Sequence, residues 1–158
     1  MGGLSRRSVS IALALMLPGV ALAQNSMPMS APQNATPATG PRVALKGYDP
    51  VSYFTDGKPE QGSAEFSFAF DDTTYWFKSA EHRDKFAADP EHYAPQFDGF
   101  CAIQLSRGLK VEADPEAWVI TNGKLYVFSK KGGPAFFNKE PLAIAEKASK
   151  TFKQLRTQ

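Results

Sequence analysis

Few side chains in this sequence could take part in chemistry: a single cysteine, two histidines and the carboxylates near them. The cysteine is Cys101, which follows a Gly-Phe pair, and the histidines are His82 and His92. A thiolate and an imidazole suit copper and zinc ions, and a glycine beside the cysteine lets a ligand loop close. We therefore predict a copper or zinc site around Cys101 and His82, with Asp98 or His92 as a further ligand.

The same cysteine has two other interpretations. A buried cysteine that packs as a small hydrophobic side chain is a common structural explanation for a single thiol. In an enzyme, Cys101 would be the nucleophile, His82 its base and Asp98 the group that orients the histidine, which requires a thiol of lowered pKa within reach of the base. No local signature of a cysteine hydrolase surrounds Cys101. We predict a protein that is not an enzyme.

A binding module without metal is a further hypothesis. The chain contains 12 Phe, 5 Tyr and 2 Trp, and a small domain with so many rings could leave some of them in a surface cleft. Most of the rings alternate along predicted strands, which is the pattern of a buried face. The partner of such a module cannot be named from these residues.

The first 23 residues are typical of a signal peptide. Arg6-Arg7 precede an apolar stretch from Val9 to Leu22, and Ala21-Leu22-Ala23 forms a small-x-small cleavage site. The apolar stretch contains Pro18 and is shorter than the roughly 20 residues that span a bilayer. We predict a periplasmic or secreted protein that does not span a membrane, exported by the Sec route or, because the paired arginines resemble its signal, by the twin-arginine route.

Charge and composition bound the rest of the chain. The sequence has 18 Lys plus Arg and 16 Asp plus Glu, so removal of Arg6 and Arg7 with the signal leaves 16 of each. This balance predicts no nucleic-acid partner. Residues 24–42 are mostly Ala, Pro, Ser, Thr, Asn and Met, which predicts a disordered linker. Residues 43–158 are predicted to form one domain, and a single cysteine excludes an internal disulfide.

Hydrophobic periodicity predicts an α+β fold with a small antiparallel sheet of hairpins. Phe66, Phe68 and Phe70 alternate with small residues, which predicts a hairpin over residues 65–78. Asn122-Gly123 lies between two apolar runs and predicts a second hairpin. Shorter extended segments are predicted at Val51–Phe54 and Leu109–Val111.

Two helices are predicted. The first is short, follows the first hairpin, begins after Ser79 as N-cap and runs to Ala88, before Asp89-Pro90. The second is C-terminal and amphipathic, with Asn138 as its cap and Pro141 in its first turn. Its apolar face is expected to pack across the sheet. The sequence shows no internal repeat.

A series of short motifs follows in a fixed order between residues 44 and 130. They are Gly47-Tyr48-Asp49-Pro50-Val51-Ser52-Tyr53-Phe54, Tyr75-Trp76-Phe77-Lys78-Ser79, Glu81-His82-Arg83 with Phe86, Pro90 with Tyr93, Gly99-Phe100-Cys101-Ala102, Asp114-Pro115 with Trp118, and Gly123-Lys124-Leu125-Tyr126. In this order and spacing they resemble the exported, single-domain branch of the YHS domain family.

This resemblance implies a small α+β fold related to treble-clef-like metal-sensing modules. Some members of the family carry cysteines that bind soft metals or accompany copper transporters. In those members a cysteine tends to follow Asp-Pro-Val and another precedes the serine after the aromatic strand, whereas this chain has Ser52 and Lys78 there. The resemblance therefore implies the fold, and it implies a role in copper binding or metal homeostasis without a full set of cysteine ligands.

Overall fold

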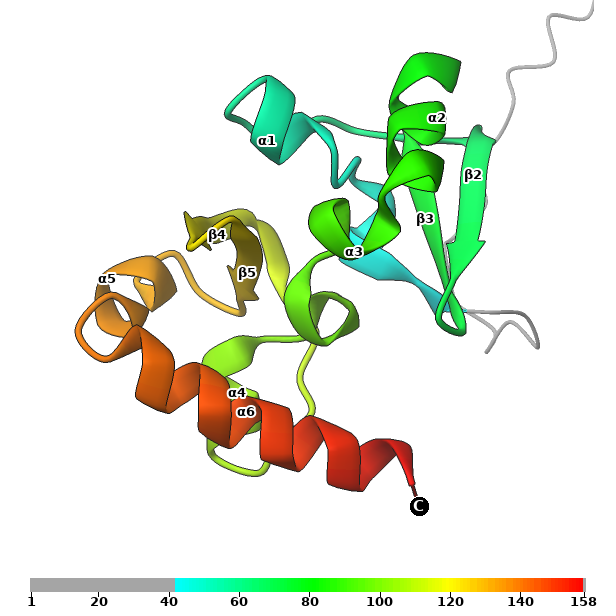
Figure 1. The fold of residues 1–158 in the computed structure, drawn as a ribbon. Helices are drawn as coiled ribbons and strands as arrows, with labels where there is room; N and C mark the ends of the chain where they lie inside the picture. The colour runs from blue at the N-terminus through cyan, green and yellow to red at the C-terminus, as the bar shows by residue number, and fades with distance from the viewer. Residues whose placement is uncertain (1–41, 158) are drawn as a thin grey trace, which may run out of the picture. The chain divides into compact units, whose positions relative to one another are not determined.

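The computed structural model describes residues 42–157, which all belong to one of the two units into which the chain divides, Thr36–Gln158. The predicted signal peptide, and the predicted linker up to residue 41, lie outside the described residues. The fold is of the α+β class, as predicted, with two small sheets and several helices (Figure 1). No helix within residues 42–157 is long and apolar enough to cross a membrane.

The first predicted hairpin is present. Strand β2 (Ser63–Phe70) pairs antiparallel with β3 (Thr73–Phe77), and the turn between them places Asp71 and Asp72 at positive φ. Two consecutive residues of this kind match the right-handed twist of the strands. A two-residue strand, β1 (Arg42–Val43), pairs parallel with β3 and completes a sheet of order β1-β3-β2. Helix α2 (Ala80–Ala88) follows with the side chain of Ser79 as its N-cap, as predicted.

The second predicted hairpin forms a separate two-stranded sheet. Strand β4 (Asp114–Thr121) pairs antiparallel with β5 (Lys124–Phe128) through the Asn122-Gly123 turn. The remaining elements are 3₁₀ helices η1 (Ala44–Gly47) and η2 (Gln96–Gly99), and helices α1 (Ser52–Thr55), α3 (Pro90–Tyr93), α4 (Ala102–Ser106), α5 (Gly133–Phe137) and α6 (Pro141–Arg156).

Two local predictions were wrong, and a third segment, Leu109–Val111, is one of the extended segments predicted but forms no strand. The β-prone run at Val51–Phe54 is mostly the short helix α1, because the amide N–H groups of Phe54 and Thr55 both donate to the carbonyl of Val51. Asn138 ends α5 and does not begin α6, whose N-cap position is Glu140.

The last helix packs differently from the expectation. Its buried residues Ile144 and Ala148 join hydrophobic clusters that contain residues of α4, including Ile103 and Leu105. Helix α6 therefore lies along α4 (Figure 1) and not across the face of a sheet. The exposed side of the helix carries ion pairs such as Lys150 with Glu146.

The structure contains an internal repeat that the sequence did not reveal. Strands β2 and β4 both have eight residues, and β3 and β5 both have five. Their registers match, because Ser63 faces Phe77 and Asp114 faces Phe128, and both hairpins have an irregularity just after this pair. Corresponding residue numbers in the hairpins differ by 51, as in Phe77 and Phe128, and those in the segments before the hairpins differ by 52, as in Tyr48 and Phe100. We name the parts the first repeat (residues 44–88) and the second repeat (residues 96–137).

The segment before each hairpin repeats as well. In η1, Leu45 and Lys46 have a φ of 52°, and in η2, Phe97 and Asp98 have φ of 60° and 53°. Bulky side chains rarely adopt this left-handed conformation, so its occurrence at two equivalent places points to a common backbone motif. The following aromatic residue, Tyr48 or Phe100, then bridges to the segment that enters the hairpin.

The same packing contact occurs within each repeat, and a hydrogen bond joins the two repeats. Each has a phenylalanine on its helix against the end of its hairpin: the ring centroids are 5.1 Å apart for Phe77–Phe86 and 5.3 Å apart for Phe128–Phe137. The hydroxyl of Tyr53 donates to the carbonyl of Pro115 at 2.8 Å and so links the first repeat to the second.

Two arginines at the ends of the domain add charged links. Arg42 donates to the carboxylate of Glu112 at 2.8 and 2.7 Å. Arg156, in the last turn of α6, donates to Asp71 at 2.6 and 2.8 Å, and these hydrogen bonds hold the pKa of Asp71 below its usual value. Helix α6 is thereby attached to the hairpin turn of the first repeat.

The repeat predicts a strong difference between two neighbouring phenylalanines. Phe137 is fully buried and corresponds to Phe86, whereas Phe136 is 46% exposed. Phe137→Ala should lower the free energy of unfolding by about 3–5 kcal/mol, because it removes a core ring. Phe136→Ala, the matched control, should cost less than about 1 kcal/mol. Urea denaturation followed by circular dichroism measures both, and equal losses would contradict the assignment of Phe137 to the repeat core.

Candidate functional site: the Cys101 cleft and its polar counterpart

The carboxylate of Asp49 is the buried polar centre of the first repeat. Asp49 is 0% exposed. Its Oδ1 accepts from the amide of Val51 at 2.8 Å, and its Oδ2 accepts from the amide of Lys78 at 3.0 Å and lies 2.7 Å from Nδ1 of His82. A buried carboxylate is stable only when its oxygens are hydrogen-bonded in this way. Asp49 thus connects the start of α1, the end of β3 and helix α2.

His82 occupies this site because its helix is capped at the right place. Ser79 Oγ accepts from the amide of His82, which fixes the first turn of α2. The side chain of His82 is 7% exposed, and Nδ1 faces the carboxylate. Nε2 makes no hydrogen bond within residues 42–157, and no fully buried side-chain nitrogen or oxygen among them lacks a partner. Nε2 therefore reaches the surface of the domain.

Cys101 has a different environment. It is 1% exposed and belongs to a hydrophobic cluster with Phe128, Phe137 and Ile144. Its amide donates to the carbonyl of Val111 at 2.9 Å, which fixes the backbone just before α4. The side chain forms no hydrogen bond to any residue that the structure describes. Cys101 therefore packs as a small hydrophobic side chain, which was one of the interpretations of the sequence.

A cleft opens beside this cysteine. It has a volume of about 300 Å³, and its lining includes Cys101, Ile103, Arg107, Phe128, Gly133 and Phe136. We call it the Cys101 cleft. It lies between α4, the turn after β5 and α5. Its volume falls at the lower end of the range of small-molecule sites, and its lining is largely apolar with a few polar groups, as in such sites.

The repeat relates this cleft to the polar centre of the first repeat. Cys101 follows Gly99-Phe100 as Asp49 follows Gly47-Tyr48, so the cysteine takes the place of the carboxylate. Gly133 takes the place of His82, because each lies five residues after the phenylalanine that ends its hairpin. The hydrogen-bonded pair that fills the first repeat is replaced by a thiol and a glycine, and the second repeat has a cleft at this place.

Gly133 is required by close packing. A Cβ atom at this position would lie 2.3 Å from Cβ of Phe128, a distance that real Cβ atoms do not show. Gly132 differs, because a Cβ there would meet no atom within 4 Å and its φ of −76° and ψ of −7° are ordinary for any residue. In this wall of the cleft, Gly133 therefore cannot be replaced by a larger residue without movement of the backbone, whereas Gly132 can be replaced.

The other predicted ligands lie elsewhere. Asp98 is in η2, where its backbone carbonyl accepts from Arg42 at 2.6 Å, and burial raises the pKa of its carboxyl because desolvation disfavours the charged form. His92 is exposed on α3, and its ring centroid lies 4.9 Å from that of Phe54. Neither side chain lines the Cys101 cleft.

The structure therefore does not gather the predicted metal ligands. His82 bonds to Asp49 in the first repeat, Cys101 packs in the second repeat, and no group of three or more His, Cys, Asp or Glu within residues 42–157 could hold a metal ion. The nucleophile and the base of the hypothetical cysteine enzyme are separated in the same way. No hydrogen bond joins Cys101 to a histidine in the described part of the chain.

Sequence analysis missed the two residues that define the site. Asp49 appears there only as part of a motif, and Gly133 is not singled out. A signal was present, because Gly-aromatic-Asp in the first repeat and Gly-aromatic-Cys in the second occur at equivalent places. Few other residues are shared between the repeats, so the pattern becomes visible only when the strand registers are known.

No family model matches the chain, and neither the curated proteins nor the solved structures include a match to it. The site is therefore assigned from its own geometry.

The polar centre predicts a large loss of stability on removal of its carboxylate. Asp49→Ala leaves the amides of Val51 and Lys78 and one nitrogen of His82 without their acceptor, so the free energy of unfolding should fall by about 3–5 kcal/mol. Asp56→Ala is the control, because Asp56 pairs only with the side chain of Lys78 near the surface. It should cost far less. Urea denaturation compares them, and a small loss for Asp49→Ala would show that this carboxylate does not organise the first repeat.

Proposed function

We propose that this domain is a non-catalytic binding module that takes a small ligand into the Cys101 cleft. The observation that carries the proposal is the difference between the repeats: the first is closed by the pair Asp49–His82, whereas the second has Cys101 and Gly133 at the equivalent positions and a cleft beside them. Close packing normally fills such positions in a core. An open apolar cleft at the end of a well-packed repeat therefore favours a ligand as its occupant.

Cys101 contributes its shape to this site. Its sulfur is buried in hydrocarbon and lines the inner wall of the cleft. A thiol with these neighbours offers polarisable apolar surface to a ligand. The signal-peptide pattern of residues 1–23 supports a periplasmic or secreted location for this binding, and the series of motifs supports a YHS-like module.

Occlusion of the cleft tests this function. Gly132→Leu adds a large side chain at a residue that lines the cleft and does so without backbone strain, because the backbone at Gly132 is helical and the space for a Cβ is free. We expect a screen of small acids, alcohols and aromatic compounds, followed by nuclear magnetic resonance of the backbone amides, to find compounds that shift the signals around Cys101. Gly132→Leu should weaken their binding at least about tenfold.

The control for this variant is Ala87→Leu, which places a leucine on the exposed side of α2. It should leave binding unchanged. If no compound shifts these signals, or if Gly132→Leu binds as well as the unchanged chain, the Cys101 cleft is not a binding site.

Copper binding is a second candidate, and the orientation of His82 is the observation that favours it. A carboxylate at Nδ1 holds the ring in the tautomer whose Nε2 lone pair is free, the arrangement common among metal-binding histidines. Cys101 lies in the other repeat, so one ion would be held by His82 or by Cys101, together with ligands from outside residues 42–157.

Anaerobic titration of the mature chain with Cu(I) tests this candidate. Binding tighter than about micromolar should be lost in His82→Asn, whose amide still donates to Asp49 in place of Nδ1 while Nε2 is removed. His92→Asn is the matched control, and Cys101→Ser tests the thiol. Weaker binding by the unchanged chain excludes the copper function, and full affinity in His82→Asn excludes His82 as the ligand.

A further inference from the structure

From the charges around the Cys101 cleft, we propose that its ligand is a small monocarboxylate with an apolar chain or ring. The apolar part occupies the cleft, and the carboxylate pairs with Arg107. This inference rests on the proposed binding function and adds the chemical class of the ligand.

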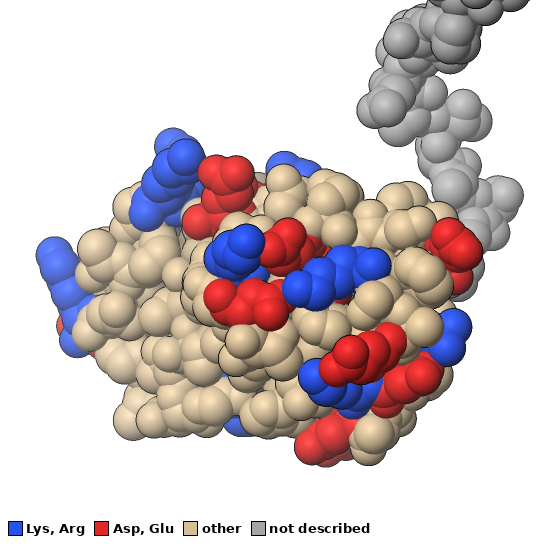
Figure 2. Space-filling model, turned by 90° about the horizontal axis from the view of Figure 1, so that it is seen from above, with Lys and Arg blue, Asp and Glu red and all other residues tan. Residues whose placement is uncertain are grey.

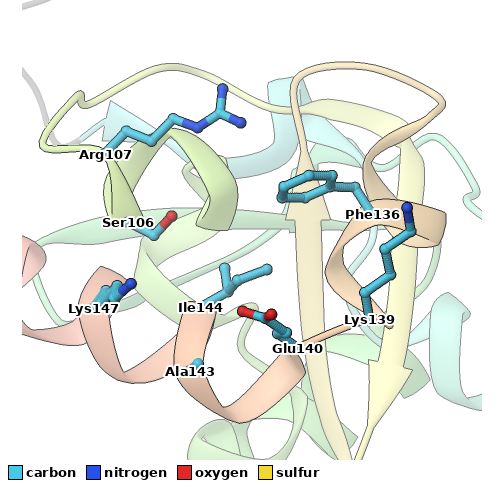
Figure 3. A pocket seen from close by; sticks show the side chains of 8 residues that line it. All are labelled: Ser106, Arg107, Phe136, Lys139, Glu140, Ala143, Ile144 and Lys147. Carbon is cyan, nitrogen blue, oxygen red and sulfur yellow. The ribbon is translucent and has the colours of Figure 1, made fainter.

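The Cys101 cleft continues into a second hollow. That hollow, which we call the α6 groove, also has a volume of about 300 Å³ and lies between the end of α4, α5 and the first turns of α6. Arg107 and Phe136 line both spaces. Figure 3 shows the ring of Phe136 on one side of the groove, Arg107 above it and Ile144 toward its centre. A ligand longer than either hollow can therefore extend from one into the other past these two side chains.

The apolar part of the proposed ligand has matching surface. Phe136 is 46% exposed, one of the few large hydrophobic side chains with so much exposure in the part of the chain that the structure describes. Its ring is at the junction of the two hollows, and Ile103 and Phe128 continue the apolar surface into the cleft. An apolar chain that covers this ring would remove it from water, which favours binding.

Cations surround this apolar surface. Arg107 lies at the junction, Lys130 at the Cys101 cleft, and Lys139 and Lys147 at the α6 groove. None of the four has a salt bridge to a carboxylate within residues 42–157, whereas other cations of the domain, such as Lys85 and Lys150, are paired. The mature chain has equal numbers of acidic and basic residues, so this cluster is a local excess of positive charge.

The face of the domain that carries α2 lacks this excess. Figure 2 views the domain from the end where α1 and α2 lie in Figure 1, and acidic and basic side chains there lie next to one another. The pairs Glu81–Lys85 and Arg83–Asp84 on α2 account for this mixture. The α4–α5–α6 region differs from that face, because its cations lie beside apolar hollows without a carboxylate partner.

The geometry favours a single negative charge on the ligand. Glu140 lines the α6 groove together with the cations and points toward its centre (Figure 3), so it would repel a group with two negative charges more than a carboxylate. Arg107 is suited to a carboxylate because its planar guanidinium donates two parallel hydrogen bonds to the two oxygens. Its guanidinium carbon lies 5.7 Å from the centroid of Phe136, which places charge and apolar surface side by side.

Binding of octanoate to the mature chain, measured by calorimetry and by amide shifts, tests the inference. Octanol has the same chain without the charge, and acetate has the charge without the chain. We expect octanoate to bind at least about tenfold more tightly than either, because a two-point hydrogen bond between a guanidinium and a carboxylate corresponds to about that factor. Added salt should weaken octanoate and leave octanol unchanged.

Two variants locate the contacts. Arg107→Gln should weaken octanoate about tenfold and leave octanol unchanged, whereas Lys124→Gln, which removes an exposed cation of the β4–β5 turn, should change neither. Gly132→Leu should weaken both compounds. Octanoate that does not bind, or that binds equally well to Arg107→Gln, would overturn the carboxylate assignment.

Two further outcomes separate this inference from the binding function itself. If octanol and octanoate bind equally and both are weakened by Gly132→Leu, the cleft is a binding site but the ligand is not selected by charge. The second outcome comes from binding of the chain to vesicles of phosphatidylglycerol. If they bind the chain in an Arg107-dependent way while free octanoate does not, the cations recognise a lipid surface, and the inference of a free carboxylate is wrong.

Discussion

The buried carboxylate of Asp49 is the constraint on which the first repeat depends. An ionised group away from water must be surrounded by donors, and the three donors to Asp49 come from three different segments: the start of α1, the end of β3 and helix α2. The carboxylate therefore fixes how these segments meet. Ser52 extends the arrangement, because its hydroxyl donates to the carbonyl of Asp49 and accepts from the amide of Glu60.

The second repeat builds the same backbone without this constraint. Its hairpin has the same strand lengths and the same register, and its 3₁₀ helix has two residues in the left-handed conformation at the equivalent positions. Cohesion there comes from apolar contacts, such as those of Phe128 with Phe137 and of Tyr126 with Phe137. Apolar contacts are less directional than hydrogen bonds to a carboxylate, so they leave room for a cleft where the first repeat requires contact.

Local patterns in the sequence were sufficient to predict the hairpins and the first helix. The alternation of Phe66, Phe68 and Phe70, the Asn122-Gly123 turn and the Ser79 cap each act within a few residues, and all three features are present. Segments decided by distant contacts could not be predicted. The run after Asp49 became α1 because the carboxylate accepts from the amide of Val51 and because α1 packs on residues that are far away in sequence.

The site was harder to predict because it is recognised only when the second repeat is compared with the first. The metal hypothesis used residue types alone, and residue types do not show that Cys101 and His82 belong to different repeats. Asp49 and Gly133 became important once the strand registers made Asp49 the equivalent of Cys101 and Gly133 the equivalent of His82. Few identical side chains mark this relation, because the repeats conserve backbone geometry and the burial of certain positions.

The close packing of Gly133 on Phe128 explains why the two repeats cannot be interconverted by a single change. A histidine at Gly133 would begin with a Cβ 2.3 Å from Cβ of Phe128, so α5 would have to move away from β5 before the side chain could enter. An aspartate at Cys101 alone would bury a charge without the histidine that accompanies it in the first repeat, at a cost of several kcal/mol. Each intermediate is unfavourable, and the open cleft of the second repeat is therefore preserved by the packing around it.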